Sequence, residues 1–482
     1  MKPENSFNIL KLFAKILLII CIGILTGCIL TAGALAVKHR NILCGLIIGL
    51  SAFAVSWIIY RKLSGKVHFH IEIKKTLIIL TVLSAAVNYF TAWSIPVYPH
   101  TDYLVFWNCA NDLCFGGELS AARYVALFPH ILGYSTLISK FIEIFGPSLT
   151  MVKILNTALS TVSGLLIFAF IYNYRRDESG LKAAALGYLL WIFFPSKNMF
   201  NAFVLSEPVY TMLILAFLVI ILMLEKKEKK ISAAIAAGVL LGIVLRAVNC
   251  LRPLAAILII AFFIWIFMLQ GSKKKKHFKF WVPLLAVMLL VYIAGGMLWN
   301  SYFEKRVGEP PASTPLYNIY VGFNPETSGA YNDEDMATLM EYSDIPGAGA
   351  DWAQHQMKDN VIERLTSGEI NYPVHFIKKL AVLAGKDNAP PYYLNGILPD
   401  KTLLFSDIVC NSFYYCIILW AVYGCIRMYK ERERGPVLLA VLYTVGLILA
   451  HMLTEVAPRY HYSILPMLVI MLAYTGKRKI TE

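Results

Sequence analysis

The chain has 482 residues, of which 58% are hydrophobic and only 15% are charged. Soluble proteins carry about 25% charged residues and roughly 45–50% apolar ones, and 44 Lys and Arg with 30 Asp and Glu cannot cover a soluble surface of this size. The composition therefore excludes a soluble globular enzyme, a disordered chain and a disulfide-rich scaffold. In a membrane protein the net charge of +14 belongs to loops at the cytoplasmic face, so we expect no nucleic-acid partner.

Apolar stretches of about 20 residues are long enough to cross the hydrocarbon core of a bilayer. About twelve such stretches follow one another along the chain, at 9–36, 42–60, 76–97, 149–173, 182–200, 203–224, 231–249, 252–270, 280–299, 403–426, 436–454 and 461–475. We therefore predict an all-α polytopic membrane protein with a bundle of about twelve transmembrane helices. The apolar stretch 126–145 contains a Pro, a Lys and a Glu, and it predicts an interfacial helix rather than a span.

Charged residues are divided unequally between alternate loops. With a cytoplasmic N-terminus, most Lys and Arg fall on the cytoplasmic side, with clear clusters at 226–230 and 273–276, and most acids fall outside. This asymmetry follows the positive-inside rule and predicts that both termini are cytoplasmic. The chain has no Asn-x-Ser/Thr sequence, which favours a bacterial inner (plasma) membrane.

Two predicted outer segments are long enough to be functional or to form small domains. We expect four parts: two N-terminal transmembrane helices in 1–75, a transmembrane core in 76–299 with the first outer loop at 98–148, an outer loop domain in 300–402, and three transmembrane helices with a basic cytoplasmic tail in 403–482. Cys109 and Cys114 share the first outer loop, where they form a disulfide in an oxidising compartment or remain two thiols.

Ionisable groups at the mouths of membrane spans are costly, which makes them candidates for function. In this sequence they gather at the predicted outer ends of spans rather than mid-span, which argues against a proton-relay pump. Asp102 follows the third predicted span. Its carboxylate can take a proton from an acceptor or bind a divalent cation, or it can simply cap a helix.

Three arginines and one glutamate share this outer placement. Arg246 and Arg252 flank the junction between the seventh and eighth spans, and Arg459 precedes the last. A guanidinium suits the phosphate of a lipid carrier because its planar fork donates hydrogen bonds in pairs, although arginines here also extend toward lipid headgroups. Glu207 opens the sixth span, where it can bond a sugar hydroxyl, brace an arginine, or favour the start of a helix.

Several short motifs occur in a consistent order between residues 76 and 475. After Asp102 they are FPHILGYSTLI, KILNTALSTVSGLLIF, VLSEPVYTMLIL, LRPLAAILI, VGFNPETSGAYN and APRYHYSILPMLVIML. In this order the chain resembles the GT-C glycosyltransferases, and most of all the glycosyltransferase family 39 and protein O-mannosyltransferase-like bacterial membrane enzymes. Two features depart from the family pattern: Tyr103 stands where many members have a second acid, and two spans precede the usual first one.

The resemblance implies a GT-C-type bundle that moves a sugar, with inversion, from a polyprenyl-phosphate donor to a glycan, lipid or protein acceptor on the outer face. It implies that Asp102 is the general base or a ligand of a possible divalent cation. It implies donor-phosphate binding by Arg252, Arg246 and Arg459. The remaining candidates for substrate binding are Glu207, His130, Lys197 and His100.

Two other classes remain open on the sequence. A transporter or flippase of lipid-linked glycans has a similar number of spans, but it needs a polar path through the membrane. A glycan polymerase or ligase also pairs outer arginines with a large outer loop. The transferase interpretation requires that Asp102 and Arg252 meet at one outer site, because positioned groups must act on one reacting centre.

Overall fold

The fold comes from a computed structural model that describes residues 3–63, 72–225, 230–269 and 275–474. Within these ranges, the side chains of residues 3–11 and 275–277 are not described. The basic segments predicted at the cytoplasmic face fall partly on 64–71, 226–229, 270–274 and 475–482, which lie outside the described residues.

All regular structure in these described ranges is helical. The first half contains α1 (Pro3–Ala36), α2 (Arg40–Leu63), α3 (Ile73–Ser94), α4 (Asp102–Phe115), α5 (Ala122–Leu127), α6 (His130–Phe145), α7 (Leu149–Tyr174), α8 (Glu178–Ile192), α9 (Pro195–Phe200), α10 (Glu207–Glu225) and α11 (Ile231–Leu251). The second half contains α12 (Ala255–Ile264), the π-helical η1 (Trp265–Leu269), α13 (Lys275–Val307), α14 (Leu316–Gly322), α15 (Asp333–Ser343), α16 (Ala350–Thr366), α17 (Tyr372–Ala384), α18 (Ala389–Tyr393), α19 (Asp400–Lys430), α20 (Val437–Leu453), the 3-10 helix η2 (Pro458–Ile464) and α21 (Leu465–Leu472).

The predicted all-α membrane bundle is confirmed. Eight helices in the described ranges are long and apolar enough to cross a membrane, namely α1, α2, α3, α7, α10, α11, α13 and α19. Two shorter apolar helical segments, Ala255–Leu269 and Val437–Leu453, fall on two more of the predicted stretches. The stretch 126–145 contains all of α6, which is not among the eight.

Two predicted spans are interrupted. The stretch 182–200 is divided into α8 and α9 because Pro195 has no N–H to continue the hydrogen-bond ladder. The stretch 461–475 begins in η2 and continues in the eight-residue α21. Both interruptions place polar side chains inside the bundle, where a continuous apolar helix would have placed none.

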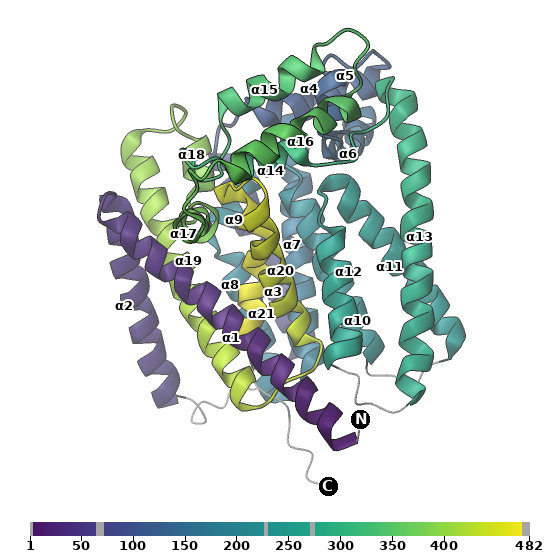
Figure 1. Ribbon diagram of the computed structural model, residues 1–482. Helices are drawn as coiled ribbons and strands as arrows, with labels where there is room; N and C mark the ends of the chain where they lie inside the picture. The colour runs from purple at the N-terminus through teal and green to yellow at the C-terminus, as the bar shows by residue number, and fades with distance from the viewer. Residues whose placement is uncertain (1–2, 64–71, 226–229, 270–274, 475–482) are drawn as a thin grey trace.

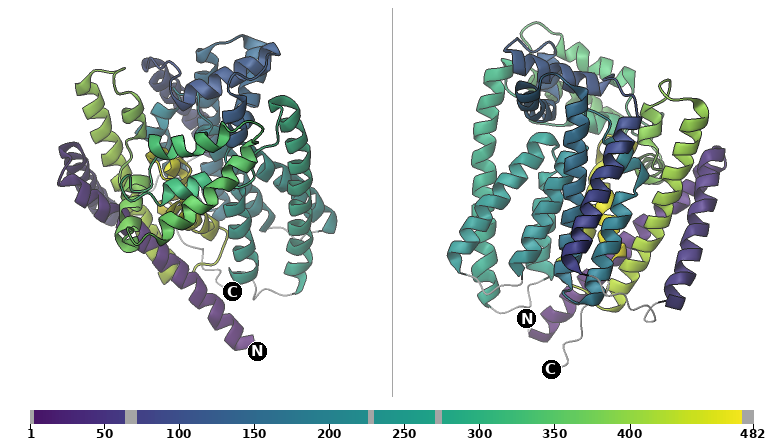
Figure 2. Two further views of the ribbon diagram at one scale, coloured as in Figure 1. Left: turned by 45° about the horizontal axis from the view of Figure 1, so that its top comes forward. Right: turned by 180° about the vertical axis from the view of Figure 1, so that it is seen from behind.

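The helices α4–α6 and α14–α16 cover one end of the bundle, which we call the loop end (Figure 1). Figure 2 shows the same helices lying across that end when it is turned forward. The helix α1 begins at the opposite end and runs obliquely over α19 and α20 (Figure 1). The loop end therefore collects the two long segments that the sequence predicts to lie outside.

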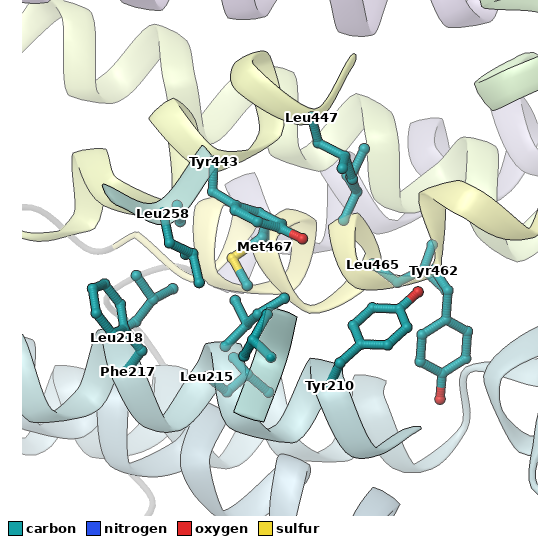
Figure 3. Close-up of a cluster of buried hydrophobic side chains, with 14 of the residues drawn as sticks. Tyr210, Leu215, Phe217, Leu218, Leu258, Tyr443, Leu447, Tyr462, Leu465 and Met467 are labelled. Atoms are coloured by element: carbon teal, nitrogen blue, oxygen red, sulfur yellow. The ribbon is translucent and has the colours of Figure 1, made fainter. Parts of the chain in front are cut away.

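The core next to the loop end is built by α10, α12, α20, η2 and α21. Figure 3 shows Tyr210, Leu258, Tyr443 and Met467 meeting there, all of them buried. The Tyr443 hydroxyl has a partner in η2, since Tyr443 Oη and Ser463 Oγ lie 2.7 Å apart. This packing fixes η2, which carries part of the candidate site.

A buried lysine makes one of the contacts that attach the segment between α13 and α19 to the bundle. Lys379 of α17 donates from Nζ to the carbonyl oxygens of Gly322, at 2.6 Å, and Thr454, at 2.7 Å. It thereby joins the end of α14 to the turn after α20. The division of the chain into four parts stays a prediction.

Candidate active site

Four elements bring charged side chains together at the loop end. Asp102 is the first residue of α4, Glu207 the first of α10, Arg252 follows the last residue of α11, and Arg459 lies in η2. The chain enters α4 through Thr101, whose φ of 51° is unusual for a residue with a side chain. This turn directs Asp102 toward η2 instead of leaving it as a cap.

Each of the two arginines has a carboxylate partner. Arg459 forms an ion pair with Asp102. Arg252 Nη2 lies 3.1 Å from Glu207 Oε1, and the Glu207 side chain is fully buried. The two ion pairs therefore lie close together, because both arginines adjoin the same ring.

That ring belongs to Tyr460. Its centroid lies 5.3 Å from Arg252 Cζ and 5.5 Å from Arg459 Cζ, within the range of cation–π attraction. The Nε atoms of both arginines are buried and find no hydrogen-bond partner within the described part of the chain. Buried donors without partners mark a place where a water molecule, ion or ligand is expected.

The two arginines set the charge of their neighbours. Burial would raise the pKa of Asp102, but the charge and hydrogen bond of Arg459, together with Arg252 and His130, outweigh burial and hold the pKa below its usual value. Burial and the two guanidinium groups lower the pKa of His130 to about 3. Asp102 is therefore a stable anion and His130 a neutral ring at neutral pH.

A third carboxylate, Glu455, joins this group; its place at the mouth of a predicted span made it a candidate in the sequence, but it was not among the predicted site residues. Tyr460 Oη donates to Glu455 Oε1 at 3.0 Å, and Asn318 Nδ2 donates to Oε2 at 3.3 Å. Burial raises its pKa, and the opposing effects of Arg459 and the Tyr460 hydroxyl do not cancel this. The local signals were its position between two predicted spans and its distance of four residues from Arg459.

Aromatic rings pack around the Asp102–Arg459 ion pair. Tyr103 lies beside Phe203 and Tyr393, with ring centroids 5.3 Å and 5.1 Å apart, and Arg459 Cζ lies 5.8 Å from the Tyr393 ring. His100 meets the edge of Tyr103 at 5.4 Å and bonds the Tyr98 carbonyl. Of the lesser candidates, His130 thus belongs to the cluster and His100 adjoins it.

Two other predicted site residues have their partners elsewhere. Lys197 is fully buried, donates to Asn88 Oδ1 at 2.8 Å and lies 5.0 Å from the Trp191 ring. Arg246 donates to the Tyr292 carbonyl at 2.8 and 3.1 Å, and its guanidinium group lies over the Tyr292 ring. Lys197 therefore joins α3 to α9, and Arg246 joins α11 to α13. Cys109 and Cys114 are free thiols.

The donor set does not fit a resident divalent cation. Asp102 is engaged by an arginine, and no group of three or more His, Cys, Asp or Glu that could hold a metal ion occurs among the described residues. Divalent cations of the Mg²⁺ and Ca²⁺ type prefer several oxygen ligands. We therefore assign no step to a metal.

No protein family model and no curated protein matches the chain. It is similar to two solved structures. One is the archaeal oligosaccharyltransferase AglB from Archaeoglobus fulgidus in complex with an inhibitory peptide and a dolichol-phosphate, with a TM-score of 0.47, 12% identity, and coverage of 83% of this chain and 50% of that one. The other is ArnT from Cupriavidus metallidurans bound to undecaprenyl phosphate, with a TM-score of 0.36, 13% identity, and coverage of 82% and 76%. The chain spans about half the length of the oligosaccharyltransferase, and neither likeness assigns a residue or a reaction to it.

Proposed function

We propose that the chain is a membrane glycosyltransferase that moves a sugar from a polyprenyl-phosphate donor to an acceptor at the outer face of a bacterial plasma membrane. The observation that carries this proposal is the pair of arginines on Tyr460. Arg252 and Arg459 are nearly buried, lie against one ring, and each retains an Nε donor without a partner among the described residues. Charged forks of this kind bind phosphate oxygens in pairs.

The reaction that suits this arrangement is a single displacement at the anomeric carbon. The acceptor oxygen or nitrogen forms a bond to that carbon, the bond from carbon to phosphate oxygen breaks, and its electron pair stays on the lipid phosphate. Arg252 and Arg459 stabilise the charge that develops there, because fixed donors in a dry site cost no reorganisation. A single displacement inverts the configuration of the sugar.

Asp102 serves chiefly to hold Arg459 in this mechanism. Its pairing with Arg459 keeps the carboxylate ionised and makes it a weak proton acceptor. Glu207 holds Arg252 in the same way from the buried side. The two carboxylates fix the direction of the guanidinium groups before the donor binds, which limits the ordering that binding must supply.

The placement of the site agrees with transfer at the outer face. The site adjoins the loop end, whereas α1 begins at the opposite end (Figure 1). Lipid-linked sugars reach such a site from the bilayer, and the acceptor, a cell-envelope glycan, lipid or protein, approaches from the side of α4–α6 and α14–α16.

The test is a transfer assay with the full chain in lipid nanodiscs. A panel of undecaprenyl phosphates bearing labelled hexoses or pentoses is supplied with a cell-envelope extract as the source of acceptor. We expect label to leave the lipid with wild type and to stay on it with Arg252→Ala. Label that stays on every lipid of the panel with wild type would contradict the proposal.

The same assay separates the two other classes. A transporter or flippase moves the labelled lipid across a vesicle membrane without breaking the sugar–phosphate bond. A polymerase or ligase releases glycan only from pyrophosphate-linked donors. Either outcome, with no turnover of monophosphate donors, replaces the transferase assignment.

A further inference from the structure

The candidate site contains three carboxylates and two arginines. Asp102 and Glu207 are each paired with an arginine. Glu455 has only neutral donors in direct contact, the Tyr460 hydroxyl and the Asn318 amide, and it forms no ion pair with any residue that the structure describes. We propose that Glu455 is the group that takes the proton from the acceptor hydroxyl or amine, a role that the family resemblance implied for Asp102.

The backbone around Glu455 holds this carboxylate in a defined place. Its N–H donates to the Asn318 carbonyl at 2.8 Å, and its own carbonyl lies 3.0 Å from His451 Nδ1. The next contact, Lys379 to the Thr454 carbonyl, fixes the preceding residue. The turn after α20 is therefore held by α14 and α17, both of which belong to the long segment 300–402.

The side chain of Glu455 reaches the reacting region through Tyr460. The Tyr460 hydroxyl bonds the carboxylate while the ring of the same residue contacts both guanidinium groups. Glu455 is half-buried, and each of its two oxygens accepts one hydrogen bond from a neutral donor, so the carboxylate keeps lone pairs for an acceptor proton. A base in this position would lie close to the proposed phosphate site. It would not be neutralised by Arg252 and Arg459, which bind the phosphate and form no ion pair with Glu455.

The chemistry assigned to Glu455 balances with the displacement described above. As the acceptor attacks the anomeric carbon, its O–H or N–H proton passes to the Glu455 carboxylate, and the electron pair of the broken bond leaves with the lipid phosphate. The raised pKa of Glu455 makes it a better proton acceptor than Asp102, whose pKa is lowered. The two carboxylates thus have separate roles that follow from their partners.

The titratable and charged groups that face Glu455 come from every element around it. They are Asp102, Tyr124, Arg252, Tyr317, Tyr331, Lys379, His451, Arg459 and Tyr460. A carboxylic acid with a raised pKa is active as a base only when ionised, so transfer must fall as pH drops through the pKa of Glu455.

This inference rests on the proposed function, and one experiment tests both separately. Transfer from the labelled undecaprenyl-phosphate panel is measured as a function of pH for wild type, Glu455→Gln and the exposed control Glu341→Gln, with binding of undecaprenyl phosphate measured in parallel. We expect Glu455→Gln to lose about 10²–10⁴-fold in transfer and the acid limb of the pH profile, while it still binds the lipid. The control should behave as wild type.

A second variant decides the matter if Glu455→Gln fails to fold. Tyr460→Phe keeps the ring between the arginines and removes only the hydroxyl that stabilises ionised Glu455. The acid limb should therefore move to higher pH. An unmoved limb in Tyr460→Phe, or equal transfer by wild type and Glu455→Gln, overturns the role of Glu455, whereas inactivity of wild type on the whole panel overturns the proposed function.

Discussion

Arg459 of η2 and Asp102 of α4 form an ion pair although 357 positions separate them in the chain. Arg459 is nearly buried, while the Asp102 side chain is 44% exposed. The pair therefore has a buried cationic side, which faces Tyr460, and an open anionic side. In the proposed function the anionic lipid headgroup is therefore held by the guanidinium side of this pair, next to Tyr460, and not by the open carboxylate.

Replacing either arginine on Tyr460 by lysine should weaken binding of undecaprenyl phosphate. Lysine keeps the charge but loses the Nε donor and the planar fork, so we expect about a 10–100-fold loss of affinity for Arg459→Lys and for Arg252→Lys. Arg246→Lys is the matched control, because Arg246 bonds the Tyr292 carbonyl instead. Titration of nanodisc-embedded protein with the lipid measures the affinity of all three variants. Equal losses of affinity would contradict the assignment of phosphate binding to Arg252 and Arg459 and not to Arg246.

Asp102→Asn should reduce transfer without abolishing the fold. The change leaves Arg459 charged but without its fixed partner, so the guanidinium is no longer held toward the phosphate. We expect about a 100-fold loss of transfer, as for removal of a preorganised electrostatic contact. The pH profile should keep its acid limb, since the lowered pKa of Asp102 means that it titrates below its usual range and does not produce that limb. Loss of the acid limb from the pH profile of Asp102→Asn would instead identify Asp102 as the base.

Glu207→Gln should destabilise the protein as well as the site. Arg252 and Glu207 are both buried, with side-chain exposures of 12% and 0%, and removal of one member of a buried pair costs about 3–5 kcal/mol. Thermal unfolding in detergent should show this loss. The exposed control Glu334→Gln should leave the unfolding temperature unchanged.

Lys379→Met should loosen the turn that carries Glu455. Two carbonyl oxygens, those of Gly322 and Thr454, lose their common donor, and an unsatisfied buried acceptor costs about 1–3 kcal/mol. The neighbouring Lys378 is exposed, so Lys378→Met is the matched control. Unfolding temperature and transfer are measured for both, and indistinguishable values would show that Lys379 does not fix the turn.

The lowered pKa of His130 should make folding stability depend on pH in a specific way. Its pKa is about 3 in the folded protein against 6.5 ordinarily, so the unfolded chain binds a proton that the folded chain does not. The contribution of His130 to folding stability therefore falls as pH drops from 6.5 toward 3. Unfolding temperature should decline less steeply over this window in His130→Gln than in wild type, and parallel curves would exclude the effect.

The sequence by itself determined that the chain is a helical membrane bundle, because the length and hydrophobicity of a span are properties of consecutive residues. It also selected five members of the cluster, Asp102, Arg252, Arg459, Glu207 and His130, because charge at the mouth of a span is costly and visible locally. Which charges meet is a different question. Arg246 and Arg252 differ by six positions in the sequence, yet one packs against α13 and the other against Glu207.

Only the tertiary structure decided these partners, since ion pairs across 45 to 357 positions depend on how helices pack. It also placed Lys197 beside Asn88 and brought Glu455 into the site through Tyr460 and Asn318. The direction of a pKa shift follows from burial and neighbouring charge, neither of which is encoded in residues next to one another. For that reason the roles of Asp102 and Glu455 separate in the fold, although both are simply outer acids in the sequence.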